Sequence, residues 1–548
     1  MGSEESKRVR KRALSGVVGG VVGAAGVIAV LTLLSRIAGL LRKLAQSWAM
    51  SDGAVATAYD TANTVPNVLF EVAAGGALAG AVIPLISKFL VRGEKDKLDR
   101  TASALVTWLL VIGVPISGLV AVFSHFIVTA LFGSGSDPEV IHLAATLLGM
   151  FALQIPFYGL SVVFTGILQA HKHFVLPALS PFLSSLVVIV VFLSYSKVVE
   201  FGTAPQAVPW SAIALLGWGT TAGVLVFSLP QLIPVMKLVR LRFTLRFPPG
   251  VARHTVRLAS AGFGALAAQQ IAILAIMYAS NSQGNIGTYN AFNYAFSIFM
   301  VPYAVLAVPV ATAVFPRISA AVESVNHATD AHDSQQGKEK LVALVSTSTR
   351  LVIGLGMVAA VLLAVLAEPA KIVIDLGRDI AGLEIAMEAM AAALVGYSVL
   401  YHGARVLYAL DAGKRVIFVN TCAWGAVCLT LFAGIVAHVH GRTPTLVLVG
   451  GALTLGMCVG TLLMIRAIKV ELGAGAVHRF ARTILLLLII LSPLAFVTKL
   501  LTGWLLQLGN YSIMAAFGTA VVVGIIVLAG GMLGIFLADR RAFSALRK

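Results

Sequence analysis

Charged residues are scarce in this chain of 548 residues. Asp, Glu, Lys and Arg together make up 11% of it, whereas hydrophobic residues make up 59%. A soluble domain carries about 25% charged residues, because its surface faces water. The composition therefore excludes an ordinary water-soluble enzyme or binding domain.

Cysteines and catalytic motifs are also rare. Cys422, Cys428 and Cys458 lie in apolar segments and form no CxxC pair, which excludes a disulfide framework and favours packing roles. The chain contains no phosphate-binding Gly-Lys loop, no HExxH, no nucleophile elbow and no His/Cys cluster with metal-ligand spacing. We therefore expect a protein that is not an enzyme and that binds no cofactor or structural metal.

Long apolar runs, in contrast, recur along the whole chain. A run of about 20 mostly apolar residues spans a bilayer as a helix. We predict an all-α, polytopic membrane protein of about fourteen transmembrane helices. The predicted spans are residues 16–44, 54–88, 101–124, 139–169, 174–196, 208–236, 255–280, 286–318, 342–367, 382–410, 415–438, 444–467, 480–502 and 511–537.

The basic residues separate between the two sides of the predicted membrane. With the N-terminus inside, 30 of the 40 Lys and Arg residues fall on the cytoplasmic side, 7 on the outer side and 3 within spans. Cytoplasmic loops collect Lys and Arg, so we predict that both termini are cytoplasmic. The net charge of +17 follows from this topology and requires no nucleic-acid partner.

Two short segments repeat each other. AVIPLIS at residues 81–87 and AVFPRIS at residues 313–319 share five of seven residues, and each ends a predicted span on the cytoplasmic side. The match indicates either two structural repeats in parallel orientation, with a substrate site between them, or a chance similarity of apolar segments. The basic segment 237–257 would connect the repeats, either as an amphipathic helix on the inner leaflet or as a solvated loop.

A stripe of positive charge lies at the end of the first predicted span. On a helical wheel, Ser35, Arg36, Gly39, Arg42 and Lys43 fall within about 120° of arc. Arginine side chains bind phosphate oxygens in pairs, and a glycine lets a bulky group approach the backbone. We interpret the stripe as a site for a polyanion such as a diphosphate. The alternative is a solvated flank beyond a span that ends near residue 34.

Two carboxylates, Asp60 and Glu71, share one face of the second predicted span. Carboxylates inside a membrane face a cavity or a partner, and Arg36 and Arg42 are the expected partners. These ion pairs either hold the first two spans together or balance the positive charge of an empty site. In the second case, each pair separates when an anionic ligand arrives. The same face carries Asn63 and Asn67, and Pro66 is expected to interrupt the helix.

The eighth predicted span carries a milder polar face. Asn290, Asn293, Tyr294 and Ser297 lie within about 100° of arc. They line the substrate cavity from the other half of the molecule or form interhelical hydrogen bonds. A site for a coupling monovalent cation, Na⁺ or H⁺, stays unassigned; weak candidates are Gln269, Gln270, Glu388, His402 and Arg405.

Four stretches resemble a known family. Residues 35–43 read SRIAGLLRK, and residues 61–87 read TANTVPNVLFEVAAGGALAGAVIPLIS. They are similar to the first two spans of the MurJ/MviN family, the lipid II flippases of the multidrug/oligosaccharidyl-lipid/polysaccharide exporter superfamily. Residues 166–181 and 301–319 resemble the family's turn after span four and its eighth span. The form of the second motif looks like that of a high-GC Gram-positive branch.

This resemblance implies an architecture. It predicts a six-span N-lobe over residues 16–236 and an eight-span C-lobe over residues 255–537, pseudo-symmetric around a central cationic cavity. A basic linker at 237–254 and cytoplasmic ends at 1–15 and 538–548 complete the chain. Arg36 and Arg42 match the family's cavity arginines, and Pro66 and Asn67 match its Pro-Asn pair.

The resemblance also implies a function. We expect a flippase that moves lipid II, the undecaprenyl-diphosphate-linked disaccharide-pentapeptide, from the inner to the outer leaflet of a bacterial cytoplasmic membrane. Alternating access would be driven by membrane potential or an ion gradient. Expected partners are lipid II, membrane lipids and cell-wall synthesis proteins. The alternatives are an exporter of another lipid-linked oligosaccharide and a non-transporting scaffold for wall synthesis.

The predicted site combines the three polar faces. The predicted substrate-binding residues are Ser35, Arg36, Gly39, Arg42, Lys43, Asn63, Asn67, Asn290, Asn293, Tyr294 and Ser297, and the predicted charge-balancing or gating residues are Asp60, Glu71 and Pro66.

Overall fold

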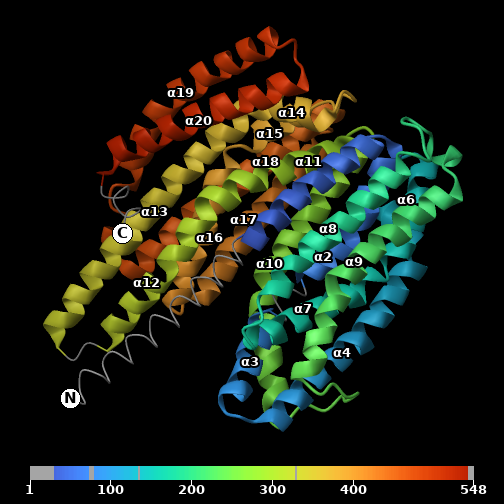
Figure 1. The fold of residues 1–548 in the computed structure, drawn as a ribbon. Coiled ribbons are helices and arrows are strands. Elements are labelled where there is room, and N and C mark those ends of the chain that lie inside the picture. Colours follow the sequence, from blue (N-terminus) through green and yellow to red (C-terminus); the bar gives the residue numbers. More distant parts are fainter. Residues whose placement is uncertain (1–29, 73–78, 134–135, 328–329, 541–548) are drawn as a thin grey trace, which may run out of the picture.

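The computed structural model describes residues 30–72, 79–133, 136–327 and 330–540, and most of them are helical (Figure 1). The predicted segment 1–15, the start of the first span and residues 541–548 lie outside the described residues. Within the described part, nine helices are long and apolar enough to cross a membrane, or up to eleven if each of two bent pairs is one span. The all-α membrane class is confirmed, and the count of fourteen stays a prediction.

The helices form two groups, which we call the N-lobe (residues 30–238) and the C-lobe (residues 251–540). Figure 1 shows the blue-to-green elements of the N-lobe beside the green-to-red elements of the C-lobe. The N-lobe contains the helix over residues 30–50, α2 (Ala54–Val72), α3 (Ala79–Val91), α4 (Lys95–Val122), α5 (Ser124–Phe132), α6 (Pro138–Phe151), α7 (Gln154–Ala170), α8 (Val175–Tyr195), the short η2 (Pro205–Ala207) and α9 (Trp210–Leu238).

The C-lobe begins with α10 and ends with the pair α19 and α20, which lies at its outer edge in Figure 1. Its elements are α10 (Val251–Gln283), α11 (Thr288–Pro302), the π-helical η3 (Tyr303–Ala307), α12 (Val308–Asn326), α13 (Ala331–Val365), α14 (Ala367–Asp375), α15 (Leu383–Met390), α16 (Ala393–Ala409), α17 (Gly413–Val436), α18 (Arg442–Leu472), η4 (Ala474–Val477), α19 (Phe480–Leu508) and α20 (Ile513–Ala538).

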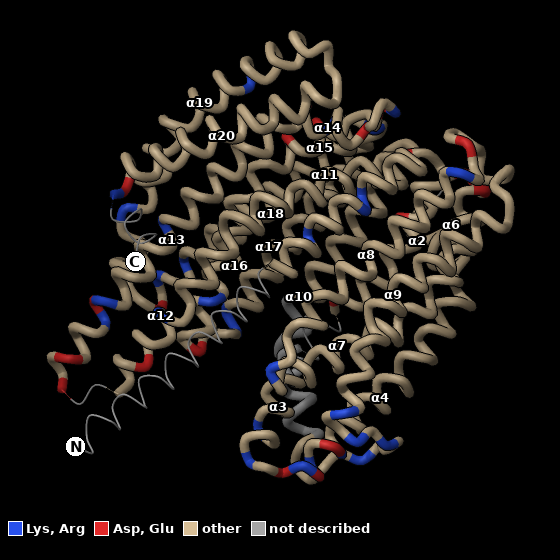
Figure 2. The backbone as a smooth tube through the Cα atoms, in the orientation of Figure 1, with Lys and Arg blue, Asp and Glu red and all other residues tan. Residues whose placement is uncertain are grey.

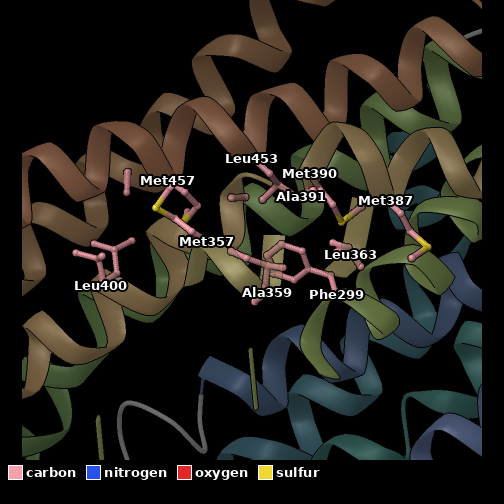
Figure 3. Close-up of a cluster of buried hydrophobic side chains, with 14 of the residues drawn as sticks. Phe299, Met357, Ala359, Leu363, Met387, Met390, Ala391, Leu400, Leu453 and Met457 are labelled. Carbon is pink, nitrogen blue, oxygen red and sulfur yellow. The ribbon is translucent and has the colours of Figure 1, made fainter. Parts of the chain in front are cut away.

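Each lobe packs around buried apolar residues of its own. The buried members of two clusters come from residues 45–239, together with Val251 at the start of α10, and those of a third come from residues 272–535. Figure 3 shows part of the third cluster, where Phe299 lies among Met357, Met387 and Met390. Because close-packed interiors resist deformation, we treat each lobe as a unit that moves against the other.

Helix α2 continues through Pro66, so the expected interruption of this helix is wrong. Polar side chains bond to neighbouring carbonyl groups of the same helix. The Thr64 hydroxyl donates to the Asp60 carbonyl at 2.7 Å, and the Asn67 amide donates to the Asn63 carbonyl at 2.7 Å. These bonds give partners to carbonyl groups in the two turns that precede the proline.

The linker between the lobes is extended over residues 240–247, so the amphipathic-helix alternative for it is wrong. It lies along α4, whose side chains bind its backbone. The N–H groups of Arg240, Arg242 and Thr244 donate to side chains of α4 at 3.0–3.2 Å. The acceptors are Asp99 Oδ1, Ser103 Oγ and Thr107 Oγ1.

The spacing of the bonded N–H groups in the linker matches the spacing of their partners along α4. Two extended residues advance by roughly 6.6 Å, and four helical residues advance by roughly 6 Å. Every second linker N–H therefore meets the next turn of α4. Side chains of a helix thus take the place of a neighbouring strand.

Candidate functional site

Lys43 and Asp60 form the centre of the candidate site. Lys43 Nζ lies 3.8 Å from Asp60 Oδ1, and the two side chains are 14% and 2% exposed. Gln46 connects them, because its Nε2 donates to Asp60 Oδ1 at 2.8 Å and its Oε1 accepts from Lys43 at 3.1 Å. A buried carboxylate is stable only when it is paired and hydrogen-bonded, and Asp60 meets both conditions.

Asp60 also bonds to the C-lobe. Its Oδ2 accepts a hydrogen bond from Asn290 Nδ2 of α11 at 2.7 Å. Thr57, one turn earlier on α2, donates to Asn290 Oδ1 at 2.8 Å and accepts from the Gly287 N–H at 3.0 Å. All of these atoms are buried, so the bonds form away from water. Asn290 therefore joins the two lobes.

Further bonds extend this contact, which we call the interlobe seam. Thr64 and Tyr289 share a hydroxyl hydrogen bond of 2.9 Å, and Asn281 donates to the Thr61 hydroxyl at 3.1 Å. At one end of the seam Arg442 pairs with Asp52. The seam consists of residues 52, 57, 60, 61 and 64 of the N-lobe and residues 281, 287, 289, 290 and 442 of the C-lobe.

Gly287 permits a close approach of the two lobes in this seam. Its φ is 88°, a conformation that favours glycine, and a Cβ there would lie 2.4 Å from the Asp52 carbonyl oxygen. Tyr294, one helical turn beyond Asn290, donates to the Ser51 carbonyl at 2.9 Å, and Lys43 lies 5.5 Å from its ring centroid.

Arg42 and Lys43 line a small polar cavity inside the N-lobe, where the expectation was a cavity between the lobes. Its walls come from residues 30–50, α2, α7, α8 and α9, and its volume is about 60 Å³. Asn63 and Asn67 of α2 contribute amides, and Tyr158 donates to Asn67 Oδ1 at 3.1 Å. This space is too small for a large headgroup, so the conformation is closed around the cations.

The stripe of the first helix is only partly gathered at this cavity. The helix continues to residue 50 and holds Arg42 and Lys43 half-buried, so these two residues are not a solvated flank. Arg36 is exposed and does not line the cavity. The Ser35 hydroxyl donates to the Leu31 and Ala178 carbonyls at 2.8 and 2.9 Å. A Cβ at Gly39 would meet nothing within 4 Å, so space is open beside it.

The sequence predicted that Asp60 and Glu71 pair with Arg36 and Arg42, and these predicted partners are wrong. Asp60 pairs with Lys43 and with amides, not with Arg36 or Arg42. Glu71 is exposed and forms no ion pair with any described residue. The helical wheel groups charges by face within one helix, but it could not determine which faces of two helices meet.

Two residues of the eighth predicted span stay near the seam without joining it. Asn293 and Ser297 are half-buried, and the Ser297 hydroxyl donates to the Asn293 carbonyl at 2.8 Å. Asn290 and Tyr294 are fully buried between the lobes, which matches the hydrogen-bonding alternative for this face in the present conformation. Their contact with a substrate stays a prediction.

Several residues of the seam and of the polar cavity were missed by sequence analysis. Gln46, Thr57 and Tyr289 were not singled out, although Gln46 lies one turn after Lys43 and Thr57 lies one turn before Asp60. Helical spacing from the chosen charges offered the only signal for them. Tyr158, on α7, had no such signal, because α7 is distant in sequence from α2.

An apolar groove lies on the other side of the first helix. Leu40 and Leu44 line it together with residues of α11, η3, α13, α14 and α20, and its volume is about 470 Å³. Its lining is almost wholly apolar. One helix therefore presents cations to a polar cavity and leucines to an apolar groove. Among the described residues, no group of three or more His, Cys, Asp or Glu is placed to hold a metal ion.

Comparison with known proteins places the chain in a family. The family model described as lipid II flippase MurJ matches residues 47–420. The chain belongs to the lipid II flippase MurJ family. The fold agrees, since a solved structure of lipid II flippase MurJ in an inward closed conformation superposes with a TM-score of 0.69 at 19% identity, covering 94% of this chain and 98% of that one.

Individual members of the MurJ family match this chain over part of their length. A probable lipid II flippase MurJ of Synechocystis sp. is 34% identical over 41% of this chain and 42% of its own length. A lipid II flippase MurJ of Burkholderia cenocepacia is 28% identical over 55% of this chain and 57% of its own length. The matched segments thus span about half of these relatives. An inward-facing multidrug-resistance MATE transporter of the MOP superfamily shares the fold, with a TM-score of 0.62 at 15% identity. The match covers 81% of this chain and 98% of the transporter.

Proposed function

We propose that this protein is a flippase for lipid II that works by alternating access. The observation that supports the proposal is the first helix, which presents Arg42 and Lys43 to a polar cavity and Leu40 and Leu44 to an apolar groove. A lipid with a diphosphate headgroup needs both environments side by side. Membership of the MurJ family, whose members are named for this substrate, supports the same assignment.

Arg42 and Lys43 bind the diphosphate in this proposal. Guanidinium and ammonium groups form charge-assisted hydrogen bonds with phosphate oxygens, which are stronger than neutral ones. Asn63 and Asn67 line the same cavity and offer amides to the headgroup, and Arg36 and the open space at Gly39 extend the site along the helix. The polyprenyl tail occupies the apolar groove, where about 470 Å³ is available.

Substrate binding and opening are coupled through Lys43. An arriving diphosphate attracts Lys43 away from Asp60, and Asp60 is the residue that holds Asn290 across the seam. The carboxylate left without its counter-charge stabilises the closed seam less. The lobes then separate on the seam side, the cavity enlarges and the headgroup passes.

The seam lies on the outer side of the membrane in this proposal. It involves the loops near residues 51–53, 285–287 and 439–441. The predicted topology places all three loops on the outer side of the membrane. Figure 2 shows Lys and Arg gathered at the opposite ends of the helices, near α3 and α12, as expected for the cytoplasmic side of a bacterial cytoplasmic membrane. Membrane potential or a Na⁺ or H⁺ gradient drives the cycle, because one charge crossing 100 mV gains about 2.3 kcal/mol.

A leaflet-resolved assay tests this proposal. Purified protein is reconstituted in vesicles with fluorescent lipid II, and a membrane-impermeant quencher measures its arrival in the opposite leaflet. We expect the Arg42→Gln/Lys43→Gln variant to lose translocation by at least about tenfold, since charge-assisted bonds contribute roughly 1.5–3 kcal/mol each. Lys197→Gln, at an exposed position in another loop, should keep the wild-type rate. Undiminished translocation by the double variant contradicts the proposal.

A further inference from the structure

A further cavity of the described chain lies in the C-lobe, away from the candidate site. It is bounded by the N-terminal half of α13, the connection between α18 and α19 and the end of α20, and we call it the α13–α19 cleft. Its volume is about 810 Å³, within the range of roughly 300–1,000 Å³ for small-ligand sites. It shares no lining residue with the cationic cavity or the apolar groove.

The lining of this cleft is strongly basic. Two carboxylates face five cations, which gives a net charge of +3 with His478 neutral. Apolar side chains, including Val342 and Leu472, form part of the wall. The cleft therefore fits an anion that also carries an apolar part. The five cations are Lys338, Arg350, Arg479, Arg482 and Arg540.

Arg350 holds the walls of the cleft together. Its side chain is only 8% exposed and pairs with Asp539 at the end of α20. Its Nη1 donates to Ser346 Oγ on α13 at 2.6 Å and to the His478 carbonyl before α19 at 3.2 Å. One guanidinium thus connects all three elements, so the cleft exists before any ligand arrives.

Three other cations of the cleft remain available to a ligand. Lys338, Arg479 and Arg482 are exposed, and no described carboxylate forms an ion pair with them. Arg479 immediately precedes α19, a helix of 29 residues whose first turn has no side-chain cap. Uncapped N–H groups and the positive end of the helix favour an anion at this position.

We propose that the α13–α19 cleft binds a phosphate-bearing anion through Arg479, Arg482 and the N-terminus of α19. The cleft lies at the end of the bundle where α19 begins and α20 ends, close to the basic clusters of Figure 2. Basic pockets between membrane helices bind phospholipid headgroups, and a soluble phosphorylated compound carries the same chemistry. This site is separate from the proposed transport site and does not depend on it.

Two probes distinguish the source of the anion. Inorganic pyrophosphate is titrated calorimetrically into the full-length protein in phosphatidylcholine nanodiscs. In parallel, native mass spectrometry counts phosphatidylglycerol retained from mixed nanodiscs. The test variant is Arg479→Gly/Arg482→Gln, in which glycine suits the φ of 66° at position 479. The matched control is Lys414→Gln/Lys469→Gln, which removes two exposed cations that do not line the cleft.

We expect the test variant to lose binding of at least one probe by about tenfold or more, while the control changes by less than about twofold. Loss of pyrophosphate binding identifies a soluble ligand, and loss of phosphatidylglycerol alone identifies a lipid. An Arg42→Gln/Lys43→Gln variant separates this site from the transport site and should keep cleft binding. The proposal is overturned if neither probe binds, if the control loses as much, or if only the Arg42→Gln/Lys43→Gln variant loses binding.

Discussion

At the scale of single residues, Lys43 links the two parts of the site. It lines the cavity beside Arg42 and lies 3.8 Å from Asp60, which in turn holds Asn290. Because Lys43 lines the cavity and contacts the seam residue Asp60, occupancy of the cavity can change the stability of the seam. A charge-assisted bond such as the one between Asn290 and Asp60 contributes roughly 1.5–3 kcal/mol net. Its loss is enough to change the population of the closed conformation severalfold.

The substitution Asp60→Asn should loosen the seam. The introduced amide lacks the charge that holds Lys43, and it has one acceptor oxygen for the two amides that donate to Asp60. Loss of about 1–3 kcal/mol should raise labelling of an Asn63→Cys reporter, applied from the outer face with an impermeant maleimide, by about fivefold or more. The native cysteines are replaced by alanine in both chains.

The matched control for this change is Asp96→Asn. Asp96 is exposed in the first turn of α4, so its loss should leave labelling unchanged. An Asp60→Asn chain that labels at the wild-type rate would show that this carboxylate does not hold the lobes together.

Asp375, at the end of α14, should make stability depend on pH. Burial raises the pKa of Asp375 to about 7, above the ordinary value of about 3.9. The folded state therefore holds a proton that the unfolded chain has lost. Its stabilising contribution is complete below about pH 4 and disappears as the pH rises through 7.

Asp375→Asn removes this dependence. The amide oxygen can still accept from the Ile380 N–H, as Oδ1 does at 2.9 Å. We expect the variant to have a higher apparent melting temperature than wild type at pH 8 and a smaller decrease between pH 5 and 8, measured in nanodiscs. Glu139→Gln, at an exposed position, serves as control, and identical pH profiles for all three chains would refute the assignment.

At the scale of elements, the linker depends on α4 for its conformation. Ser103 accepts from the Arg242 N–H at 3.0 Å and donates to the Arg240 carbonyl at 3.3 Å, and Thr107 accepts from the Thr244 N–H. Without these hydroxyls the extended backbone would lose its partners. The contact thus attaches the start of the C-lobe to the body of the N-lobe.

Ser103→Ala/Thr107→Val should release the linker. Each lost bond contributes about 1 kcal/mol, so cleavage by trypsin after the linker arginines should accelerate by about fivefold or more. Gel analysis of the reconstituted protein measures the rate. Ser117→Ala, which removes a hydroxyl of α4 bonded to the Ala152 carbonyl, should not change it. Equal cleavage of all chains would mean that the hydroxyls do not hold the linker.

At the scale of the whole molecule, the seam is one of several contacts between two lobes with largely separate cores. The lobes also meet where Ser47 donates to the Ile374 carbonyl and where Arg378 lies 4.6 Å from the Trp48 ring centroid. Packed cores move as units, so separation of the lobes must break the bonds of the seam. Thr61 and Asn281 face each other across it at 3.1 Å. This geometry makes the pair suitable for a reversible cross-link.

Cross-linking Thr61→Cys/Asn281→Cys with a short, reducible reagent should arrest the cycle. We expect lipid II translocation to fall to background in the vesicle assay and to recover when reductant cleaves the link. Each single-cysteine chain, treated in the same way, should translocate normally. Full activity of the cross-linked protein would exclude separation of the lobes at this seam as a transport step.

Local chemistry determined much of this architecture. Apolar runs require helices inside a membrane, because a bilayer offers no partner for backbone N–H and C=O groups. The predicted spans fall mostly in helices among the described residues, although the spans 139–169 and 382–410 each consist of two helices with a bend between them. Helical spacing likewise placed Arg42 and Lys43 on one face, and the structure holds them at one cavity. Such features depend only on residues within a turn or two of each other.

The pairing of faces was determined only by the tertiary structure. Nothing in the periodicity of α2 indicates that Asp60 meets Gln46 and Asn290, or that the cations of the first helix face the interior of the N-lobe. The linker was ambiguous for the same reason, since its conformation depends on side chains of α4 more than 130 residues earlier. Sequence by itself determines which residues share a helical face, because that follows from bond geometry; which faces meet depends on the packing of the whole chain.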